Sequence, residues 1–489
     1  MKYLIHKTKS KIGLLVLLIA FSLQFTSCEF ADDLLDTKSS SDLTSSDIFK
    51  TPERIEGLVN GTYKSLKNGS LYGSRLLFNM DIRGEEFINL TNNAFSGFDG
   101  WANNYSASSS DVAGIWGAAY TTINAANVLI DGLEKLEGVI DDNLKLQYIA
   151  EARFIRGLSY FSLITLYGRP YIEDNGASKA IPLRLRPETT GANNDLARST
   201  VAQVYDQILS DLNFAESELP EKYSNNELNT TRAHKNTAIS LKTRIYLNMG
   251  NFDKVLEEVV KIVPQADPPF SAVNGVKNEL NANILNIFNS DYTTTESVFS
   301  LPMSALDPPG NPLGSSYNVN SEFSLNADGI LGDPRWGTDD ARRGMLRQNT
   351  TTGQYFLIKY AKPFPYIDYV PVIRYAEVLL NYAEAAAHSD RAEIAVKLLK
   401  SVRFRSDPGY VFPEADISSG ESLLNAIRIE RRIELLGEGF RSNDLLRNLL
   451  PIPAKNSSSY QARQVNPTDD AYIFPLPNSE IIANKLLLN

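Results

Sequence analysis

Catalytic side chains are scarce in this sequence. It contains one cysteine, Cys28, and three histidines, of which only His234 and His388 lie outside the N-terminal leader. These two are far apart, and each falls at the end of a predicted helix, where a histidine commonly caps the helix or faces solvent. No HExxH, GxSxG or GxxxxGK[ST] motif occurs. The sequence therefore favours a binding protein over an enzyme, with no metal and no cofactor.

Paired carboxylates are the remaining catalytic option, because glycosidases use two of them across the scissile bond. Asp81, Glu85 and Glu86 lie close together in the sequence, as do Asp328 and Asp333. Nothing in the sequence places two of them across a sugar, and with 58 acidic residues such near pairs arise by chance. We do not predict a glycosidase.

The aromatic and polar residues of two irregular regions, 69–110 and 264–369, suit a sugar ligand. A sugar ring presents apolar C–H faces, which flat aromatic side chains cover, and hydroxyl edges, which carboxylate, amide and guanidinium groups bind. Two of the three tryptophans fall in these regions. The alternative is that each aromatic side chain packs its own loop. The candidate ligand-binding residues are Asp81, Arg83, Trp101, Tyr105 and Trp336.

Helical periodicity outside these regions predicts the elements that position them. Apolar residues recur at intervals of three and four, and the stripe that contains Trp116 places that residue in the core. Caps and breakers bound the segments, such as Thr51-Pro52 at one start and Gly168 with Pro170 at one end. The predicted helices are residues 52–63, 111–136, 142–167, 199–220, 233–249, 252–263, 371–387, 391–404, 421–436 and 440–448.

The later helices fall into pairs. The Gly250-Asn251 turn, between a helix with small residues and a second amphipathic helix, is typical of a tetratricopeptide unit. We predict a mostly α fold, with four tetratricopeptide-like helix pairs as the scaffold and the irregular regions as the ligand face. Loops of this length inside a compact domain are usually functional or disordered, and their aromatic residues argue against disorder.

The N-terminus predicts export and lipidation. Residues 1–27 combine four lysines, no acidic residue and an apolar run that suits a signal peptide and is too short to span a bilayer. Thr26 and Ser27 precede Cys28, as small residues do at a lipoprotein cleavage site, although Phe25 stands where leucine is more usual. The alternative is a free thiol left there by chance. With no second cysteine, the chain has no internal disulfide.

The predicted organisation is a signal peptide (1–27), a lipidated N-terminus and tether (28–46), and one large domain (47–489). The tether is rich in Ser, Asp and Thr and cannot pack a core. Its acids fit outer-membrane sorting, and a solvated linker is the alternative. Loss of the four leader lysines moves the formal charge from −10 to −14, which disfavours nucleic acid as a partner.

Several stretches, in order along nearly the whole chain, resemble the SusD/RagB family. Asp33-Leu34-Leu35-Asp36 resembles the family's mature N-terminus, and Ile123–Asn127 resembles its first long helix. Glu151–Phe161, followed by Leu166-Tyr167-Gly168, is similar to its most recognisable stretch. Further similar stretches are Arg374–Ala385, Glu430–Leu435, Gly439–Arg441, Asp444-Leu445 and Phe474–Pro477, with Glu480-Ile481 and Asn484.

The resemblance implies an outer-membrane lipoprotein, exposed at the cell surface, that captures an oligosaccharide. It implies delivery to a SusC-like TonB-dependent transporter, and the two proteins commonly form a dimer of such pairs. It also implies a scaffold of tetratricopeptide helix pairs. The shared motifs are mostly scaffold, and we expect Arg153, Glu377 and Arg431 to make ion pairs between helices. No motif therefore carries a ligand-binding residue onto this chain.

Two other hypotheses remain. The first is capture of an oligopeptide, which the RagB branch of the family supports. The second is a pure tetratricopeptide adaptor that binds protein only. The aromatic loops favour the glycan. The placement of Trp101, Tyr105 and Trp336 separates the hypotheses, because the glycan hypothesis weakens if all three are buried.

Overall fold

The computed structural model describes residues 48–488, apart from 192–193, 290–291, 309–311 and 419. The predicted signal peptide (1–27), Cys28 and the rest of the tether to residue 46 lie outside the described residues, so they stay predictions. The chain divides into a unit that ends at Ile55 and a unit that begins at Glu56. The described part of the first unit contains the start of helix α4 (Pro52–Leu66).

Helices dominate the second unit, which confirms the prediction of a mostly α protein. Within the described residues, none of them is long and apolar enough to cross a membrane. The long helices are α7 (Ser110–Glu134), α8 (Asp142–Tyr167), α10 (Val201–Glu218), α12 (Lys235–Asn248), α15 (Tyr375–His388), α16 (Ala392–Ser406) and α17 (Gly420–Glu434). The shorter helices are α5 (Arg75–Ile82), α6 (Phe98–Trp101), α9 (Tyr171–Asp174), α11 (Asn226–Thr231), α13 (Phe252–Val259), α14 (Leu285–Asn289), α18 (Arg441–Leu446) and α19 (Asn478–Ala483).

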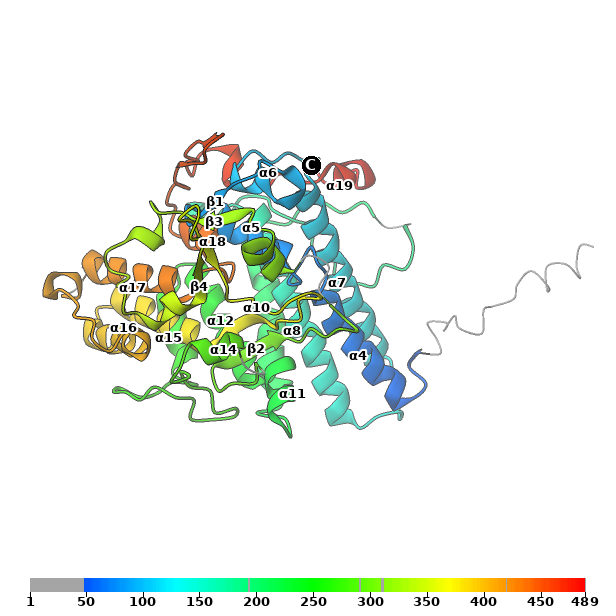
Figure 1. Ribbon diagram of the computed structural model, residues 1–489. Helices are drawn as coiled ribbons and strands as arrows, with labels where there is room; N and C mark the ends of the chain where they lie inside the picture. Colours follow the sequence, from blue (N-terminus) through cyan, green and yellow to red (C-terminus); the bar gives the residue numbers. More distant parts are fainter. Residues whose placement is uncertain (1–47, 192–193, 290–291, 309–311, 419, 489) are drawn as a thin grey trace, which may run out of the picture. The chain divides into compact units, whose positions relative to one another are not determined.

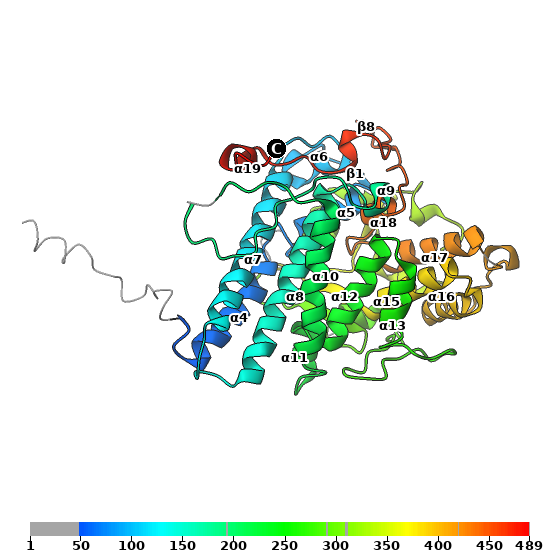
Figure 2. The ribbon, with the colours of Figure 1, turned by 180° about the vertical axis from the view of Figure 1, so that it is seen from behind.

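The long helices stand side by side in a row, as Figure 2 shows from behind. In this row α7 packs on α8, α8 on α10, α10 on α12, α12 on α13, and α13 on α15, which contacts α16 and α17. Their bounds agree with the predicted ones to within a few residues, with one exception: residues 371–374, predicted as helix, belong to a strand. The tetratricopeptide character of the pairs stays a prediction.

Side-chain caps fix where these helices begin. The Asp141 carboxylate accepts hydrogen bonds from the backbone N–H groups of Asn143 (2.9 Å) and Leu144 (3.4 Å) at the start of α8. Thr200 and Gln203 form a reciprocal capping box at the start of α10. Such caps satisfy amide groups that lack a partner in the first turn, and each contributes about 0.5–2 kcal/mol.

Ion pairs join neighbouring helices, as predicted for three charged residues of the family motifs. Each pair links side chains from two different helices, so it fixes how one helix lies on the next. The pairs are Arg153 of α8 with Glu134 of α7 (3.7 Å), Glu377 of α15 with Arg244 of α12 (2.5 Å), and Arg431 of α17 with Asp444 of α18 (3.2 Å).

The two regions expected to be irregular contain more regular structure than predicted. Residues 69–110 include α5, whose eight residues are all buried, and α6. A helix that is buried on every side has no polar face, so its sequence shows no helical period. Asp81 therefore lies on a helix, not in a loop as expected. Residues 264–369 include α14 and several short strands.

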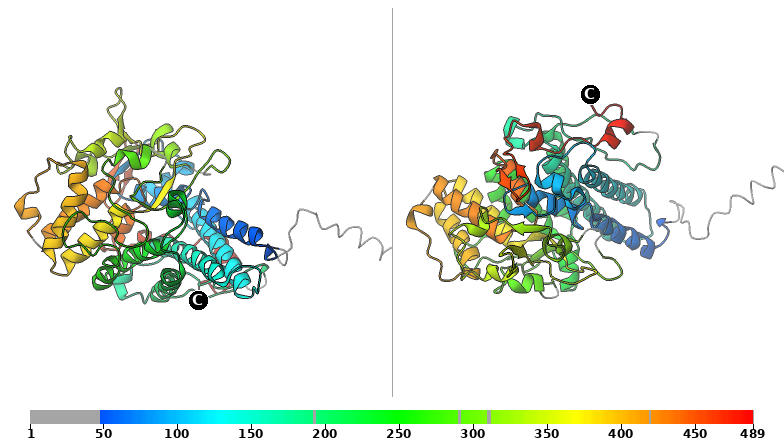
Figure 3. Two further views of the ribbon diagram at one scale, coloured as in Figure 1. Left: turned by 90° about the horizontal axis from the view of Figure 1, so that it is seen from below. Right: turned by 45° about the horizontal axis from the view of Figure 1, so that its top comes forward.

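Within the part of the chain that the structure describes, four antiparallel strand pairs accompany the helices. They are β1 (Phe87–Asn89) with β3 (Phe323–Leu325), β2 (Ser297–Leu301) with β6 (Val370–Arg374), β4 (Leu346–Gln348) with β5 (Tyr355–Leu357), and β7 (Lys455–Asn456) with β8 (Gln461–Ala462). Both strands of the β2–β6 pair are wholly buried and contact α12. Figures 1 and 3 show most of the strands and irregular segments on one side of the row of long helices, together with short helices such as α5 and α14.

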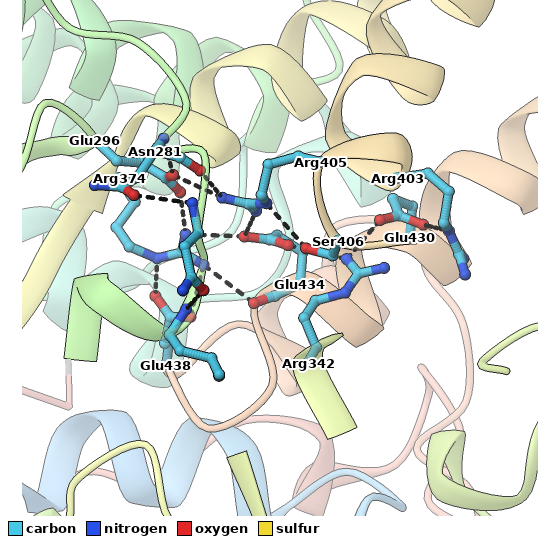
Figure 4. Close-up of polar contacts among 12 residues, drawn as sticks. Asn281, Glu296, Arg342, Arg374, Arg403, Arg405, Ser406, Glu430, Glu434 and Glu438 are labelled. Carbon is cyan, nitrogen blue, oxygen red and sulfur yellow. Dashed lines mark hydrogen bonds and ion pairs between the residues drawn. The ribbon is translucent and has the colours of Figure 1, made fainter. Parts of the chain in front are cut away.

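A network of buried ion pairs joins the end of β6 to α16 and α17 (Figure 4). Arg374 illustrates it, because this guanidinium contacts Glu296 (2.5 Å), Glu434 (2.9 Å) and Glu438 (2.7 Å). All of these side chains are almost completely excluded from solvent. The network joins the cations Arg342, Lys359, Arg374, Arg403 and Arg405 to the carboxylates of Glu296, Asp340, Glu430, Glu434 and Glu438.

Candidate functional site

The strand pair β1–β3 joins the two irregular regions. Phe87 lies opposite Leu325 and Asn89 opposite Phe323. Just beyond the pair, the Leu90 backbone N–H donates to the carbonyl oxygen of the residue before β3, Glu322, at 2.9 Å. Because the strands are antiparallel, the segment that leaves β1 and the segment that enters β3 emerge at the same end of the pair.

Asparagine side chains hold the segment that follows β1. The Asn89 Oδ1 accepts hydrogen bonds from the backbone N–H groups of Thr91 (3.1 Å) and Asn92 (2.7 Å). The Asn93 Oδ1 accepts one from the N–H of Phe95 (3.1 Å). Asn92 has a φ of +55°, a left-handed conformation that asparagine tolerates because its side chain bonds locally. These turns place the Phe95 ring in solvent, with 91% of the residue exposed.

The segment that leads into β3 lies beside the segment that leaves β1, and it follows the short π-helix η3 (Ser315–Val319). Arg347 of β4 holds η3 by donating hydrogen bonds to the side-chain and backbone oxygens of Asn318, both at 3.0 Å. Val319 and Asn320 are exposed at its turn.

A third segment, the turn between β7 and β8, closes this end, because the Asn92 Nδ2 donates to the Ser459 hydroxyl (2.8 Å). The exposed side chains at this end include one flat aromatic ring and the carboxamides of three asparagines, and the partly buried Glu322 carboxylate accepts a hydrogen bond from the Thr91 hydroxyl at 3.5 Å. A sugar needs this combination, since its C–H face packs on the ring and its hydroxyls bond the polar groups. We call these residues the loop-tip surface: Asn92, Asn93, Phe95, Val319, Asn320 and Glu322.

Two cavities of the second unit lie elsewhere. One of about 570 Å³ is lined by residues 183–190 and Leu196. Another of about 440 Å³ lies between α10, α12 and α13. Its buried Lys242 bonds Glu258 (2.8 Å), and Lys261 bonds Glu216 (2.7 Å), so these charged groups already satisfy one another. The loop-tip surface, by contrast, includes a ring that projects into solvent, since Phe95 is 91% exposed.

Asp81 and Arg83, two of the predicted ligand-binding residues, are buried at the end of α5. Asp81 accepts hydrogen bonds from the Tyr317 hydroxyl and the Gly439 N–H, both at 2.9 Å. Burial raises the pKa of Asp81 to about 7, although these hydrogen bonds favour the ionised form. The Arg83 Nη2 donates to the Tyr105 hydroxyl (2.7 Å) and to a backbone carbonyl. Both side chains hold loops together in this structure.

The predicted aromatic residues take different positions. Trp101 is fully buried, and its indole N–H donates to the Phe87 carbonyl oxygen at 2.8 Å. Trp336 is 3% exposed, and its ring stacks on the Arg343 guanidinium at 4.1 Å. Tyr105 is only partly buried, beside Arg83. Each tryptophan therefore packs its own loop here, and a ligand contact by any of the five residues stays a prediction.

The carboxylates considered as a glycosidase pair are bound by arginines. Glu85 accepts a hydrogen bond from Arg441 (2.9 Å), and Glu86 accepts one from Arg432 (2.7 Å). Both carboxylates are buried within the first irregular region. They therefore fasten this region to α17 and α18, and this arrangement does not place them across a substrate.

Phe95 is a candidate ligand-binding residue that sequence reasoning did not include. It lies in the stretch Thr91-Asn92-Asn93-Ala94-Phe95-Ser96-Gly97. A single aromatic residue among turn-forming residues was the available signal, because such turns lie at the surface and expose their side chains.

Two family profiles match the sequence. Residues 33–247 match SusD-like_3, described as "Starch-binding associating with outer membrane". Residues 366–489 match SusD_RagB, described as "SusD family". The two matches contain the first irregular region and the C-terminal helix pairs.

Solved structures and relatives are similar over nearly the whole length. A SusD superfamily protein from Bacteroides fragilis is 31% identical, with 91% of this chain and 100% of that chain covered and a TM-score of 0.81. The SusD-like protein P2 of Formosa agariphila is 26% identical, with 90% and 92% covered. A laminarin-binding SusD-like protein has the same fold, with 20% identity, 89% and 98% covered and a TM-score of 0.69.

Proposed function

The chain belongs to the SusD/RagB family, and we propose that it binds an oligosaccharide at the cell surface through the loop-tip surface. The family profile over residues 33–247 carries the words starch-binding, and one protein of the same fold is described as laminarin-binding. These descriptions support a glycan in preference to a peptide. The proposed role is capture, without a catalytic step.

The exposed ring of Phe95 carries this proposal. At 91% exposed, it gives up the free energy that burial of an aromatic side chain provides, which is about 1.5–3 kcal/mol. Asn92 and Asn93 beside it carry carboxamides that can bond sugar hydroxyls on the same face. Local hydrogen bonds already order this segment, so a ligand would not have to order it on binding.

The five residues predicted from the sequence enter the proposal in two ways. Tyr105 is partly exposed, so it could touch a ligand without movement of the loop. Asp81, Arg83, Trp101 and Trp336 are buried, so their replacement would act through the position of the loops.

Membership of the family supports a proposal for the location of the protein and for its partner. We propose that Cys28 carries the lipid that fixes the chain to the outer surface of the outer membrane. A lipid anchor with more than one acyl chain holds a protein durably, since each buried CH₂ contributes about 0.8 kcal/mol. We propose that the captured glycan passes to a SusC-like TonB-dependent transporter.

The test is a binding screen of the purified protein against a glycan panel and a peptide digest, with affinity measured by titration calorimetry. We expect one glycan class to bind, and Phe95→Ala to weaken it at least tenfold, because the stacking surface is lost. Val411→Ala is the matched control, since Val411 is an 83% exposed apolar residue outside the loop-tip surface.

Three results would count against the proposal. Binding of peptides with no binding of glycans would assign the chain to peptide capture. Equal affinity of the wild type and Phe95→Ala would place the glycan elsewhere. Shortened glycan products, detected by chromatography after incubation, would show a catalytic step.

A further inference from the structure

The turn between β7 and β8 carries a partly exposed aromatic side chain, Tyr460, beside the loop-tip surface. Figure 2 shows β8 and α6 at the same end of the molecule. The Ser457 N–H donates to the Tyr460 carbonyl oxygen at 2.8 Å, and the Ser457 hydroxyl oxygen accepts a hydrogen bond from the Tyr460 N–H at 3.1 Å. These two bonds close the turn and hold the backbone of Tyr460 in place.

Lys455 of β7 anchors the base of this hairpin. Its ammonium group is buried and donates to the backbone carbonyl oxygens of Arg83 (3.0 Å) and Gly84 (2.6 Å), which follow α5. It also lies 5.4 Å from the centre of the Trp101 ring, in a cation–π contact. The hairpin is therefore fixed to the segment that leads into β1.

Two contacts place the turn next to the segment that carries Phe95. The Asn92 Nδ2 donates to the Ser459 hydroxyl at 2.8 Å. The Phe98 ring meets the Tyr460 ring edge-on, with the ring centres 5.0 Å apart. Phe98 comes three residues after Phe95, and three residues of chain span at most about 10 Å. The side chains of Phe95 and Tyr460 therefore lie close together, although they are far apart in the sequence.

The hydroxyl group of Tyr460 is available to a ligand. The ring packs against Phe98 and, with ring centres 6.2 Å apart, against Trp101. The hydroxyl itself has no hydrogen-bond partner among the residues that the structure describes. By contrast, the buried Tyr317 hydroxyl donates to Asp81 at 2.9 Å. A tyrosine whose ring is held and whose hydroxyl is free can donate to or accept from a sugar hydroxyl with little loss of freedom.

The rest of the hairpin offers the same chemistry. Its exposed side chains carry hydroxyl and carboxamide groups, and residues 456–461 include no charged residue. Such groups bond the hydroxyls of a sugar without the cost of removing water from a charge. The exposed residues are Asn456, Ser458, Ser459 and Gln461.

We propose that the Tyr460 hydroxyl bonds a second sugar unit, so that the site takes an oligosaccharide that extends from the Phe95 ring to the turn between β7 and β8. The inference rests on the proposed function and adds selection by length. Phe95 supplies the stacking surface that a ligand of any length uses. Tyr460 supplies a hydrogen bond that only a longer ligand reaches, so a longer oligosaccharide binds more tightly than a short one.

The test measures the affinity of the purified protein for sugar fragments of increasing length by titration calorimetry. The probes are linear fragments of starch, of laminarin and of any other glycan that binds in the panel. Tyr460→Phe removes the hydroxyl and keeps the packed ring. We expect it to bind long fragments about twofold to tenfold more weakly than the wild type, with unchanged affinity for the shortest fragment that binds measurably.

Two other variants complete the design. Phe95→Ala should weaken the binding of every length. Tyr246→Phe is the matched control, because Tyr246 is a partly exposed tyrosine of α12, in the row of long helices. Tyr246→Phe should bind all fragments as the wild type does. The unfolding midpoint of each variant checks the fold, and Tyr460→Phe should leave it unchanged.

Four results would overturn the inference. Wild-type affinity of Tyr460→Phe for every fragment would show that the hydroxyl does not touch the glycan. An equal loss for short and long fragments would place Tyr460 at the first sugar unit. Equal affinity of the wild type for all lengths would show a site for one unit. A similar loss in Tyr246→Phe would show a nonspecific effect.

Failure of the proposed function would look different. In that case the wild type would bind no glycan at all, or Phe95→Ala would bind each fragment as tightly as the wild type does. The inference about Tyr460 would then fall with the proposed function.

Discussion

Two regions of this protein bury charge in different ways. In the network of Figure 4, Arg374 lies among carboxylates, and its neighbours share them with further arginines. At the end of α5, Asp81, Arg83 and Lys455 are equally buried, but their hydrogen-bond partners are uncharged groups. The Lys455 ammonium, for example, donates to three successive backbone carbonyls, those of residues 82–84.

The difference predicts where the protein responds to pH. Burial alone would raise the pKa of Glu434 and Glu438, but the neighbouring cations of the network outweigh it and hold the pKa of both carboxyls below its usual value. Burial without an opposite charge acts against ionisation: it raises the pKa of Asp81 to about 7 and lowers the pKa of Lys455 well below its usual range. Since α5 contacts β1, this response lies directly beneath the segment that forms the loop-tip surface.

The largest effect is expected from Arg374→Met. This change removes the cation that contacts Glu296, Glu434 and Glu438, and leaves buried carboxylates with fewer partners. Breaking a buried ion pair from one side costs about 3–5 kcal/mol. Urea unfolding at pH 7 should show a loss of stability of that size.

Arg374→Lys is the control for this prediction, because it keeps the charge but not the two-pronged guanidinium. We expect it to recover part of the loss. A change below about 1 kcal/mol for Arg374→Met would show that the network contributes little and that packing holds this region.

Asp81→Asn should raise the stability of the protein, and by less than Arg374→Met lowers it. The pKa of Asp81 is about 7 in the folded chain, against a usual value near 3.8. Below both pKa values the carboxyl is protonated in the folded and in the unfolded chain, and the free energy of unfolding has its full value. As the pH rises toward 7, the unfolded chain loses the proton first, so the free energy of unfolding falls. Above pH 7 the carboxyl is ionised in both states, and the loss in the free energy of unfolding no longer changes with pH.

The amide introduced by Asp81→Asn cannot ionise, so this substitution should remove the fall in the free energy of unfolding between pH 4 and pH 7. We expect the variant to be about 2–3 kcal/mol more stable than the wild type at pH 8, since each unit of pKa shift corresponds to about 1.4 kcal/mol and the amide loses one acceptor. Denaturant unfolding from pH 4 to pH 8 measures it. Parallel pH profiles for the two proteins would show that Asp81 ionises normally in the fold.

The same contrast explains how far the sequence could predict the structure. The long helices and the ion pair of Glu377 were predictable, because an amphipathic helix shows its period and a charge in an apolar row needs a partner. Helix α5 was not, since it is buried on every side. Most of strand β6 was predicted as the start of a helix, because a buried strand and a buried helix both appear as a short apolar run.

The candidate site was harder to predict for a related reason. Residue type indicated that Trp101 and Arg83 could bind a sugar, but type does not reveal whether a side chain faces solvent or fills its own loop. Orientation depends on contacts between distant segments, such as the pairing of β1 with β3. Phe95 is exposed because local asparagine turns hold it away from that core.

The smallest effect on stability is expected at an exposed ion pair. Such a pair measures what pairing of opposite charges contributes where the charges are not buried. Asp131, in the last turn of α7, and Lys135, which follows the end of the helix, have their charged atoms 2.7 Å apart, with side chains 43% and 73% exposed. Water screens both charges, so such pairs typically contribute about 0.3–0.5 kcal/mol. Lys135→Gln should therefore change the free energy of unfolding by less than about 0.5 kcal/mol. The measurement is urea unfolding at low and high salt, beside Arg374→Met. An equal loss in the free energy of unfolding for Lys135→Gln and Arg374→Met would show that pairing alone, and not burial, determines the contribution of a charge. The contrast between the two buried regions would then be wrong.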